Sequence, residues 1–382
     1  MGLLVTTAIW ALFVATTLWL PFRGGPAGFA IFVVTMACNE IPLVLLPVFV
    51  ASVAVSLGDA VGETGPMIAA LVIACLVTIG MVWLQVRARS VRPALEAALS
   101  ASLGADWRAS IRPEFVTPVP PAAPWVCGIL LPFQRHMGTV ERVRNVPYAT
   151  GGRAHLLDIY RRKDAATRRP VVIHLHGGGF VQGGKSRESI ALLNQLADHG
   201  WICFSANYGL RSQGAFPRSL VDTKRVIAWV RADAAEHGAD PDQIYLVGGS
   251  AGGHLAISAA LTASDSRFQP GFEQADTSVA GAVSLYGYLG PRVSDPASSP
   301  ASLARPDAPP ILIVQGAKDT ALPPALAPSV AAALQSVSTS PIVYAELPDT
   351  QHDFDFFSSV RARVVANATE AFLGWARSRS SI

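Results

Sequence analysis

The stretch from Leu246 to Leu255 reads Leu246-Val247-Gly248-Gly249-Ser250-Ala251-Gly252-Gly253-His254-Leu255 and joins an apolar strand end, a turn of small residues and the start of a helix. Gly248 and Gly252 flank Ser250 in the pattern G-x-S-x-G. A sharp turn from strand to helix crowds its neighbours, and glycines at these two positions leave room for them. Such a turn exposes the serine oxygen at the carboxyl edge of the sheet, where the helix N-terminus favours negative charge. The pattern is that of a nucleophile elbow, and it predicts an acid, a base and an oxyanion-binding loop elsewhere in the chain.

A second glycine-rich stretch, His176-Gly177-Gly178-Gly179-Phe180, follows an apolar run over Val171–Leu175 that predicts a strand. Glycines leave backbone N–H groups unobstructed, and fixed N–H donors are what an oxyanion hole requires. Loops of this HGGG type accompany nucleophile elbows. A phosphate-binding loop is the alternative, because Gly183-Gly184-Lys185-Ser186 mimics the end of that motif. The surroundings of the stretch favour the oxyanion-binding loop.

Candidates for the acid and the base follow Ser250 along the chain, in the order that this arrangement requires. Asp319 stands just after the apolar run Ile311–Gln315, and His352 follows a run that ends at Leu347. Each run predicts a strand, so both side chains would lie at the carboxyl edge of a sheet. There His352 would take the proton of Ser250 and return it to a leaving group, while Asp319 would hold the imidazole in the required tautomer.

Two rival carboxylates, Asp349 and Asp353, lie close to His352 in the sequence. Asp353 is the immediate neighbour of the histidine, and a side chain at that position would point elsewhere. Asp319 is therefore favoured as the acid.

From about Val140 onward the apolar pattern alternates between strands and helices. Such alternation predicts an α/β fold over residues 140–382, with a mostly parallel sheet, helices on both faces and a ligand site at the carboxyl ends of the strands. We expect strands over His155–Tyr160, Val171–Leu175, Trp201–Ala206, Gln243–Val247, Val279–Leu285, Ile311–Gln315 and Pro341–Leu347. We expect helices over Arg187–His199, Ser219–His237, Ser250–Thr262, Pro324–Ser336 and Ser358–Ser378.

The first 86 residues differ from the rest in composition. The chain is 51% hydrophobic and 15% charged, yet before Arg87 the charged residues are only Arg23, Glu40, Asp59 and Glu63. A helix needs roughly 20 apolar residues to cross a membrane, and three runs of about that length or more are present: Leu3–Phe22, Gly28–Leu57 and Met67–Val86. The sequence therefore predicts an all-α transmembrane region of about three helices over residues 1–86. A signal peptide is the alternative for the first run, but no positive segment precedes it.

Basic residues flank these runs unevenly. Arg23 follows the first run, the second loop carries no base, and three arginines over Arg87–Arg92 follow the third run. The positive-inside rule then places the N-terminus outside and everything after the third run in the cytoplasm, as a multi-pass protein of the cell membrane. If the second run is a re-entrant pair, broken at Pro42 or Pro47, the orientation reverses.

Glu40 lies inside the second apolar run, where an ionisable group is a candidate functional site. The run shows no second buried charge that would form a proton relay. The favoured interpretation is therefore a glutamate near a helix break that is either paired locally or protonated.

Residues 87–139 are expected to form a linker and a possible cap. Ser90–Leu103 has the spacing of an amphipathic helix, and a proline-rich extended stretch follows. Trp125–Phe133 is apolar but too short to span a membrane. Three interpretations stay open for it: a segment lying on the membrane, a cover over the pocket, or a strap packed on the domain.

The composition also limits the class of protein. The formal net charge is only +3, and no block of Lys and Arg with interleaved aromatic residues indicates nucleic-acid binding. The four cysteines form no CxxC pair and indicate neither a disulfide framework nor a metal site. No metal or organic cofactor is expected, and the sequence does not define an oligomeric state.

Together these motifs resemble the hormone-sensitive-lipase-like branch of the α/β-hydrolase fold. The resemblance covers about Val140 to Trp375 and rests on His176–Phe180, Gly248–Gly253, Asn207–Leu210 followed by Phe216-Pro217, and His352–Phe354. Two further stretches are similar to a bacterial membrane-associated carboxylesterase and lipase subgroup: Phe268–Glu273 and Ala275–Thr277. By the matching motifs, the resemblance implies a triad of Ser250, Asp319 and His352, and an oxyanion hole formed by the N–H groups of Gly178, Gly179 and Ala251.

The resemblance implies a membrane-anchored serine carboxylesterase or lipase that hydrolyses small-molecule or lipid acyl esters through an acyl-enzyme. An amidase, a formamidase or an acyltransferase with the same triad is the alternative. A hydrolase-like binding module without activity is less favoured, because such modules usually lack a triad residue and all three are present here.

Two features depart from the family pattern. Gly249 stands where an aspartate usually precedes the serine. The segment between Gly287 and Ile311 is also short, whereas relatives often carry a helical cap insertion there. The pocket would therefore be open unless residues 107–135 cover it.

Overall fold

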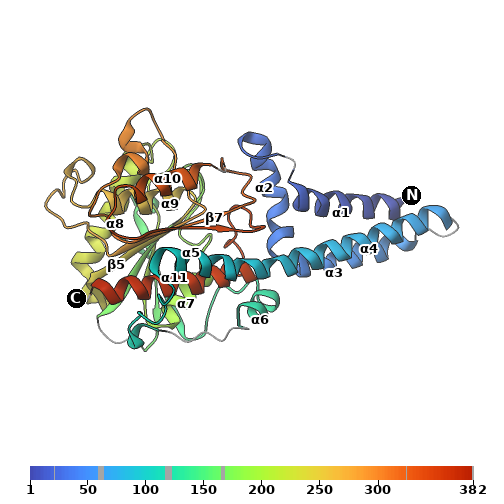
Figure 1. The fold of residues 1–382 in the computed structure, drawn as a ribbon, viewed down its shortest axis with the longest axis horizontal. Coiled ribbons are helices and arrows are strands. Elements are labelled where there is room, and N and C mark those ends of the chain that lie inside the picture. The colour runs from blue at the N-terminus through green and yellow to red at the C-terminus, as the bar shows by residue number, and fades with distance from the viewer. Residues whose placement is uncertain (21, 59–63, 117–122, 165–167, 324, 381–382) are drawn as a thin grey trace.

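The computed structural model describes residues 1–382 except 21, 59–63, 117–122, 165–167, 324 and 381–382 (Figure 1). The molecule has a broad body, which contains the sheet, and a narrow projection made of N-terminal helices. The acidic residues Asp59 and Glu63 and the prolines at 118, 120 and 121 lie outside the described residues.

The body is built on one eight-stranded sheet in the order β1-β2-β4-β3-β5-β6-β7-β8. β1 pairs with β2 and β2 with β4 in antiparallel fashion, and all other neighbours are parallel. The strands are β1 (Val140–Pro147), β2 (Leu156–Arg162), β3 (Arg169–Leu175), β4 (Ile202–Ala206), β5 (Ala239–Gly249), β6 (Gly281–Leu285), β7 (Ile311–Gly316) and β8 (Ile342–Leu347). The mostly parallel sheet is confirmed. β1 was not expected, because this half-exposed edge strand carries several charged residues instead of an apolar run.

Helices cover both faces of the sheet, as the alternating pattern predicts. One face carries α8 (Arg218–Asp233), α9 (Ala251–Leu261) and α10 (Leu326–Gln335). The other carries α5 (Val91–Leu103), α7 (Ile190–Asp198) and α11 (Val360–Ser380).

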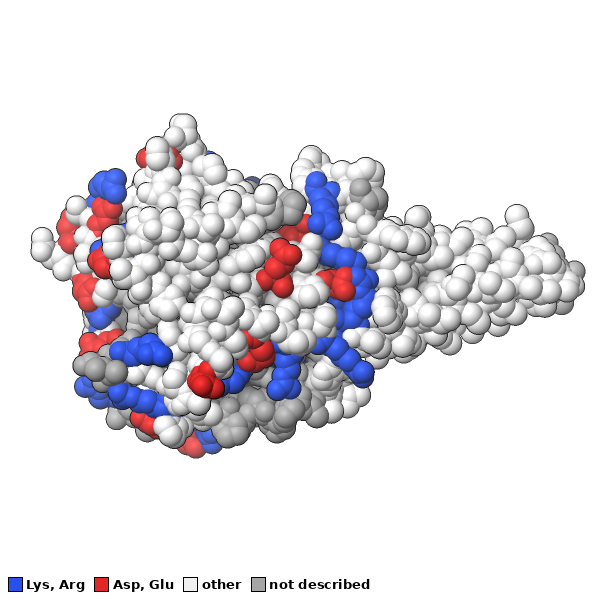
Figure 2. Space-filling model, in the orientation of Figure 1, with Lys and Arg blue, Asp and Glu red and all other residues white. Residues whose placement is uncertain are grey.

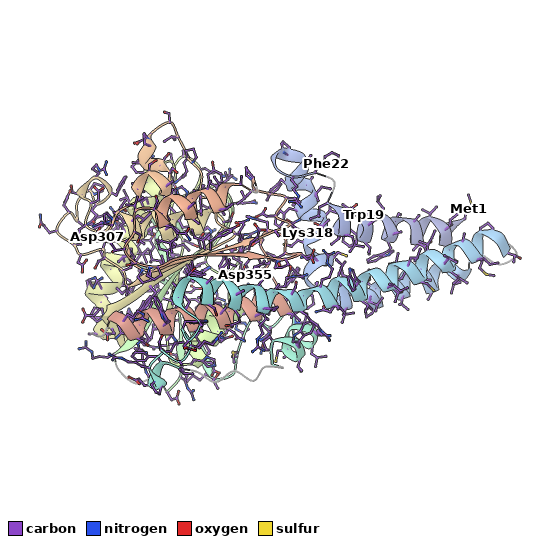
Figure 3. The ribbon with its side chains drawn as sticks, viewed as in Figure 1. Met1, Trp19, Phe22, Asp307, Lys318 and Asp355 are labelled. Atoms are coloured by element: carbon purple, nitrogen blue, oxygen red, sulfur yellow. The ribbon has the colours of Figure 1, made fainter. Side chains whose placement is uncertain are left out.

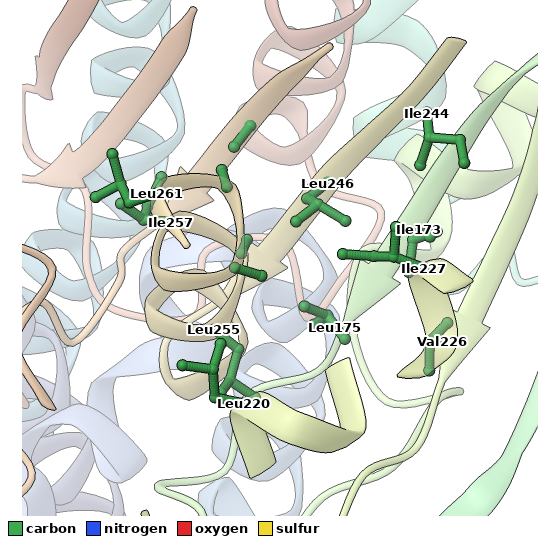
Figure 4. Packing of buried hydrophobic residues seen from close by; sticks show 14 of the residues in the cluster. Ile173, Leu175, Leu220, Val226, Ile227, Ile244, Leu246, Leu255, Ile257 and Leu261 are labelled. Carbon is green, nitrogen blue, oxygen red and sulfur yellow. The ribbon is translucent and has the colours of Figure 1, made fainter. Parts of the chain in front are cut away.

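Successive residues of a strand point to opposite faces, so each strand supplies both cores. Ile173 and Leu246 pack beneath α8 and α9 (Figure 4). Their chain neighbours Val172 and Val247 are buried in the core on the side of α7 and α11. The sheet is thereby fixed on both faces, and the loops at its carboxyl edge start from rigid strand ends.

The projection contains α1 (Gly2–Trp19), α3 (Pro42–Leu57) and α4 (Thr64–Arg87), which lie side by side (Figure 1). Trp10 donates its indole N–H to Ser52 at 3.1 Å and is partly buried against the neighbouring helices. α4 continues through the short helix η2 (Ala88–Ser90) into α5. By length and composition, Gly2–Trp19 and the continuous helix Thr64–Leu103 could each cross a membrane, and the pair α2–α3 would make a third span if it counted as one.

The second apolar run is not one straight helix. α2 (Gly25–Glu40) and α3 meet at an angle of 94°, and α2 lies across the end of the projection, next to the body (Figure 1). The break falls at Ile41, directly before Pro42, because proline has no N–H for the helix and disfavours the helical conformation of the residue before it. Pro47 lies inside α3 without ending it.

Residues 87–139 are not a free linker in their described parts. The apolar stripe of α5, formed by Val91, Leu95 and Leu99, is buried, and α5 packs on β8 and α11. A further helix, α6 (Ala123–Leu130), also packs on α11. This segment therefore belongs to the body and ties the sheet to α4.

Candidate active site

Ser250 occupies a strained turn between β5 and α9. Its φ of 51° and ψ of −113° lie in a region that residues with a side chain rarely adopt. The flanking glycines make the turn possible: a Cβ on Gly252 would lie 1.9 Å from the carbonyl oxygen of Leu175, and a Cβ on Gly248 would lie 2.2 Å from that of Gly252. The strain therefore follows from the tight packing of strand against helix, as the elbow pattern predicts.

The structure brings the three predicted triad residues together in one hydrogen-bonded chain. His352, in the loop after β8, places Nε2 3.1 Å from Ser250 Oγ. Its Nδ1 lies 2.7 Å from Oδ2 of Asp319, in the loop after β7. In this geometry the imidazole can donate a hydrogen bond from Nδ1 to Asp319 and accept the proton of the serine hydroxyl at Nε2.

Asp319 is held rigidly behind the imidazole. Its Oδ1 accepts the backbone N–H groups of Ala321 at 2.9 Å and Leu322 at 3.0 Å. Its Oδ2 also accepts from the amide of Gln315 at 2.7 Å. These donors fix the carboxylate toward His352 and stabilise its charged form in a buried position.

The electrostatics of His352 favour a base with a raised affinity for protons. Burial disfavours its charged form, but the negative charge of Asp319 and the hydrogen bond to it outweigh that effect and raise the pKa of His352 above its ordinary value. A base of this kind accepts the serine proton more readily, and its imidazolium is stabilised as it forms.

The two rival carboxylates have other partners. Asp349 forms ion pairs with Arg87 and, at 3.2 Å, with Lys318. Asp353 forms an ion pair with Arg187. Neither contact involves His352, which agrees with the preference for Asp319.

The glycine loop after β3 lies against the elbow. A Cβ on Gly177 would be 3.1 Å from the Cβ of Ser250. Gly178 and Gly179 have φ values of 115° and 63°, which only glycine adopts without strain. Within the described residues, the backbone N–H groups of Gly178, Gly179 and Ala251 donate no hydrogen bond. They remain available beside the serine, which is the requirement for an oxyanion hole.

The phosphate-binding alternative does not fit the same loop. Lys185 directs its ammonium group to Asp158 at 2.7 Å and to Asn145 at 2.8 Å. The next helix, α7, begins only at Ile190, so no helix N-terminus follows the lysine directly. Lys185 is thus already paired with a carboxylate, and no helix begins where the phosphate-binding motif requires one.

A buried network that the sequence did not reveal supports the glycine loop. The carboxylate of Glu188 accepts the N–H of Gly177 and forms an ion pair with Arg187 at 3.0 Å. Burial and the nearby charge of Asp353 raise the pKa of Glu188 to about 8, and the same causes raise that of Asp355 to about 6. These residues carry no motif, so only the fold identifies them.

Tyr286 explains why a glycine, Gly249, precedes Ser250 where the family usually has an aspartate. A Cβ on Gly249 would lie 2.5 Å from the Tyr286 hydroxyl, so an aspartate does not fit there. The hydroxyl donates a hydrogen bond to Asp355, and the ring packs edge-on against His352 with 4.9 Å between centroids. Tyr286 thus fills the space that a larger residue before Ser250 would need.

The segment next to His352 comes from the N-terminal helices. Of the three interpretations that stayed open for Trp125–Phe133, the packing of α6 fits the strap on the domain: α6 lies on α11, with Gly128 against the backbone of Ser359 and Val360. α2 lies at the site instead: the ring of Phe32 contacts His352 edge-on, with 5.3 Å between centroids. A phenylalanine in an apolar run gives no sequence signal for such a role.

Comparisons with known proteins agree with this geometry. The sequence model of the BD-FAE family matches residues 157–290. Esterase LipQ of Mycobacterium tuberculosis is 39% identical over 267 residues, which are 63% of this chain and 63% of that protein. Esterase LipC of the same organism is 36% identical over 285 residues, or 67% of this chain and 69% of that protein. The chain thus spans less than two thirds of the length of LipQ.

A solved structure supports the fold. The truncated form of a carbohydrate esterase from gut microbiota superposes with a TM-score of 0.53 at 20% identity, covering 61% of this chain and 96% of that chain. The sheet order, the elbow and the loops at the carboxyl edge define an α/β-hydrolase. Within that class, the chain belongs to the hormone-sensitive-lipase-like family, and the resemblance stated from the motifs is confirmed.

Proposed function

We propose that this protein is a membrane-anchored serine carboxylesterase or lipase. The observation that carries the proposal is the hydrogen-bonded chain from Ser250 through His352 to Asp319 at the carboxyl edge of the sheet. The esterase names of LipQ and LipC support ester hydrolysis as its chemistry.

In the acylation step, the Ser250 oxygen attacks the ester carbonyl carbon while His352 Nε2 takes the hydroxyl proton. The carbonyl oxygen becomes negative and accepts the N–H groups of Gly178, Gly179 and Ala251. His352 then gives its proton to the departing alkoxide, which leaves as an alcohol. The acyl group stays on the serine as an ester.

In the deacylation step, His352 takes a proton from water, whose oxygen attacks the acyl carbon. The same oxyanion donors stabilise the second tetrahedral intermediate. When it collapses, His352 returns the proton to Ser250 and the carboxylic acid leaves. No step in this sequence needs a metal or an organic cofactor.

We further propose that α1, α3 and α4 cross the cell membrane and that the body lies in the cytoplasm. Figure 2 shows basic residues gathered where the body meets the projection, while the described residues on the face of the projection in view are uncharged. At this junction Arg23 donates a hydrogen bond to the carbonyl of Ala317 in the body. In return, Lys318 of the body donates to the carbonyl of Leu18 in α1. Cationic side chains at one end of an apolar bundle are typical of the cytoplasmic membrane surface. Because α2 lies across the end of the bundle, the third crossing would be made by α3 alone, whose 16 residues rise about 24 Å, and the N-terminus would lie on the opposite side from the body.

Ser250→Ala tests the catalytic proposal. We expect ester turnover by the full-length protein to fall at least about a thousandfold, and labelling by a fluorophosphonate to be lost. Ser258→Ala is the matched control, since this buried serine on α9 has a hydroxyl without a partner among the described residues. Retained turnover in Ser250→Ala would refute the mechanism.

The same preparation distinguishes hydrolysis from the alternatives. A chain-length series of acyl esters gives the substrate preference, and matched amides test for amidase activity. An acyltransferase would pass the trapped acyl group to an added alcohol in preference to water, whereas a hydrolase releases the free acid.

The orientation is tested by protease treatment of intact and permeabilised cells that carry a C-terminal epitope tag. A cytoplasmic body predicts that the tag is protected until the inner membrane is opened. Digestion of the tag in cells whose inner membrane is still intact would contradict the proposed topology and place the body outside the cytoplasm.

A further inference from the structure

The helix α2 is seated on both loops that carry the predicted acid and base. At its start, Gly24 donates its N–H to the carbonyl of Thr320, in the loop after β7, at 2.8 Å. Farther along, Thr35 accepts a hydrogen bond at 3.3 Å from Gln351, the neighbour of His352. Gly28 permits this close approach, because a Cβ there would lie 2.2 Å from the Thr320 oxygen. The seat is thus formed by specific contacts and not by apolar contact alone.

The other end of α2 is held by a buried ion pair. Arg361 of α11 donates to the carbonyl of Asn39 at 2.6 Å and lies 3.5 Å from the carboxylate of Glu40. Ser359 donates to the same carboxylate at 2.8 Å. The side chains of Glu40 and Arg361 are 0% and 1% exposed, and a buried charge is costly unless its partner stays in place. The pair therefore holds α2 on the body. Glu40 is thus paired locally, as expected, since it also accepts from the amide of Asn39 at 2.9 Å, and its further partners come from the far end of the chain.

The two sides of α2 differ. Phe32 and Thr35 are buried against the catalytic loops, whereas Phe29, Val33 and Val34 on the same helix are 50%, 56% and 50% exposed. Large exposed apolar side chains next to a binding site usually mark contact with lipid or with a partner. Here the exposed side continues into the apolar projection, with Trp19 and Phe22 at the junction (Figure 3). The outer side of α2 therefore shares the environment of the proposed membrane helices.

We propose that α2 is the cap of this active site and that esters dissolved in the bilayer reach Ser250 past it. This inference rests on the proposed function. α2 stands between the apolar surroundings of the bundle and the imidazole of His352, and its inner side gives an apolar wall beside the base. Phe32, as the residue on that wall that touches His352, sets the preference for the apolar part of the ester. The N-terminal helices then supply both the anchor and the cover that the short segment between β6 and β7 lacks.

The test compares two esters on full-length protein reconstituted in vesicles of phosphatidylcholine and phosphatidylglycerol. One is p-nitrophenyl palmitate dissolved in the bilayer, and the other is p-nitrophenyl acetate in the water. Gly28→Ala forces a methyl group against Thr320 and lifts α2 from its seat. We expect the ratio of kcat/KM for palmitate to that for acetate to fall about tenfold, because only the palmitate depends on the wall. Gly65→Ala is the matched control, since a Cβ on this glycine of α4 meets nothing within 4 Å.

Phe32→Leu provides a second variant that keeps an apolar side chain of similar size and carries the test if Gly28→Ala does not fold. We expect the same ratio to change at least about threefold, with a shift of the preferred chain length. An unchanged ratio in both variants, or wild-type protein that cleaves acetate but not palmitate, would overturn the inference and leave the proposed function standing. Wild-type protein that cleaves neither ester and is not labelled at Ser250 would instead remove the proposed function itself.

Discussion

The body and the N-terminal helices are built by different rules. In the body, successive residues of the central strands are buried in the two opposite cores, and every predicted catalytic side chain follows directly on a strand end or lies in the loop after one. In the projection, the helices are apolar on all sides, so their sequence specifies helices but hardly their arrangement. A few small and polar residues of α2, among them Gly28, Thr35 and Glu40, make the contacts that bring this helix to the site. Precise geometry in the body thus comes from periodic burial, and at the junction it comes from individual contacts.

The largest expected effect is a loss of kcat when the predicted acid of the triad, which lies in the body, is changed. Asp319→Asn removes the charge that raises the pKa of His352, and we expect kcat to fall about 10³–10⁴-fold. Since His352 must be neutral to accept a proton, wild-type kcat/KM should rise with pH through its raised pKa. The variant should show this rise at a lower pH. Asp307→Asn, in an exposed ion pair far from the junction (Figure 3), should leave rate and pH profile unchanged.

The next effect tests the glycine loop. A Cβ on Gly178 would lie 1.9 Å from the carbonyl of Gln182, at a φ of 115° that favours glycine. Gly178→Ala should therefore displace the oxyanion donors and lower kcat about a hundredfold, with a smaller change in KM. Gly138→Ala meets nothing within 4 Å and serves as the control. Equal kcat values in the two variants would contradict the assignment of the loop.

A third experiment removes the buried ion pair at the junction and leaves the predicted triad residues unchanged. Glu40→Ala leaves the buried guanidinium of Arg361 without its carboxylate, and we expect the free energy of unfolding in detergent to fall by about 3 kcal/mol. The exposed Glu236→Ala should change it by less than about 0.5 kcal/mol. If the pair acts as a unit, Glu40→Leu combined with Arg361→Met recovers most of the loss. A double variant as unstable as the sum of both single variants would argue against coupling.

The smallest effect concerns the network behind the glycine loop. Burial raises the pKa of Glu188 from 4.5 to about 8, so the folded state binds a proton that the unfolded state releases in this range. The stability from this group is complete below about pH 4.5 and is lost as the pH rises through 8. Denaturation between these pH values should show a negative slope of up to about 1.4 kcal/mol per pH unit from this group. Glu188→Gln should flatten the slope, whereas Glu236→Gln should keep it.

Much of the body could be predicted because its signals are local. The G-x-S-x-G and HGGG stretches require glycine for steric reasons, and the structure shows the close contacts at Gly252 and Gly178 that explain it. The parallel strands follow from short apolar runs, and the order of Ser250, Asp319 and His352 places them at one sheet edge. The roles of these residues remain predictions until the variants are measured.

The contributions of Glu188, Tyr286 and Phe32 could not be predicted, for a physical reason. Each acts through a contact between segments far apart in the sequence, such as Phe32 with His352. No periodicity or motif records such a contact. The sequence left open whether the second apolar run is one span or a broken, re-entrant pair. The position of α2 after the break depends on Arg361, some 320 residues away, which donates to the carbonyl of Asn39.

In the proposed membrane arrangement, the continuous helix from Thr64 to Leu103 would couple the body to the thickness of the bilayer. It is 40 residues long, or about 60 Å. No loop interrupts it between the bundle and its α5 part, which packs on β8. A helix whose apolar length exceeds the hydrocarbon layer tilts to relieve the mismatch. Because this rod has no joint, its tilt passes directly to the sheet. In that arrangement the body would lean toward or away from the headgroups as the lipid composition changes, and the thickness of the membrane would set the angle between the body and the bilayer.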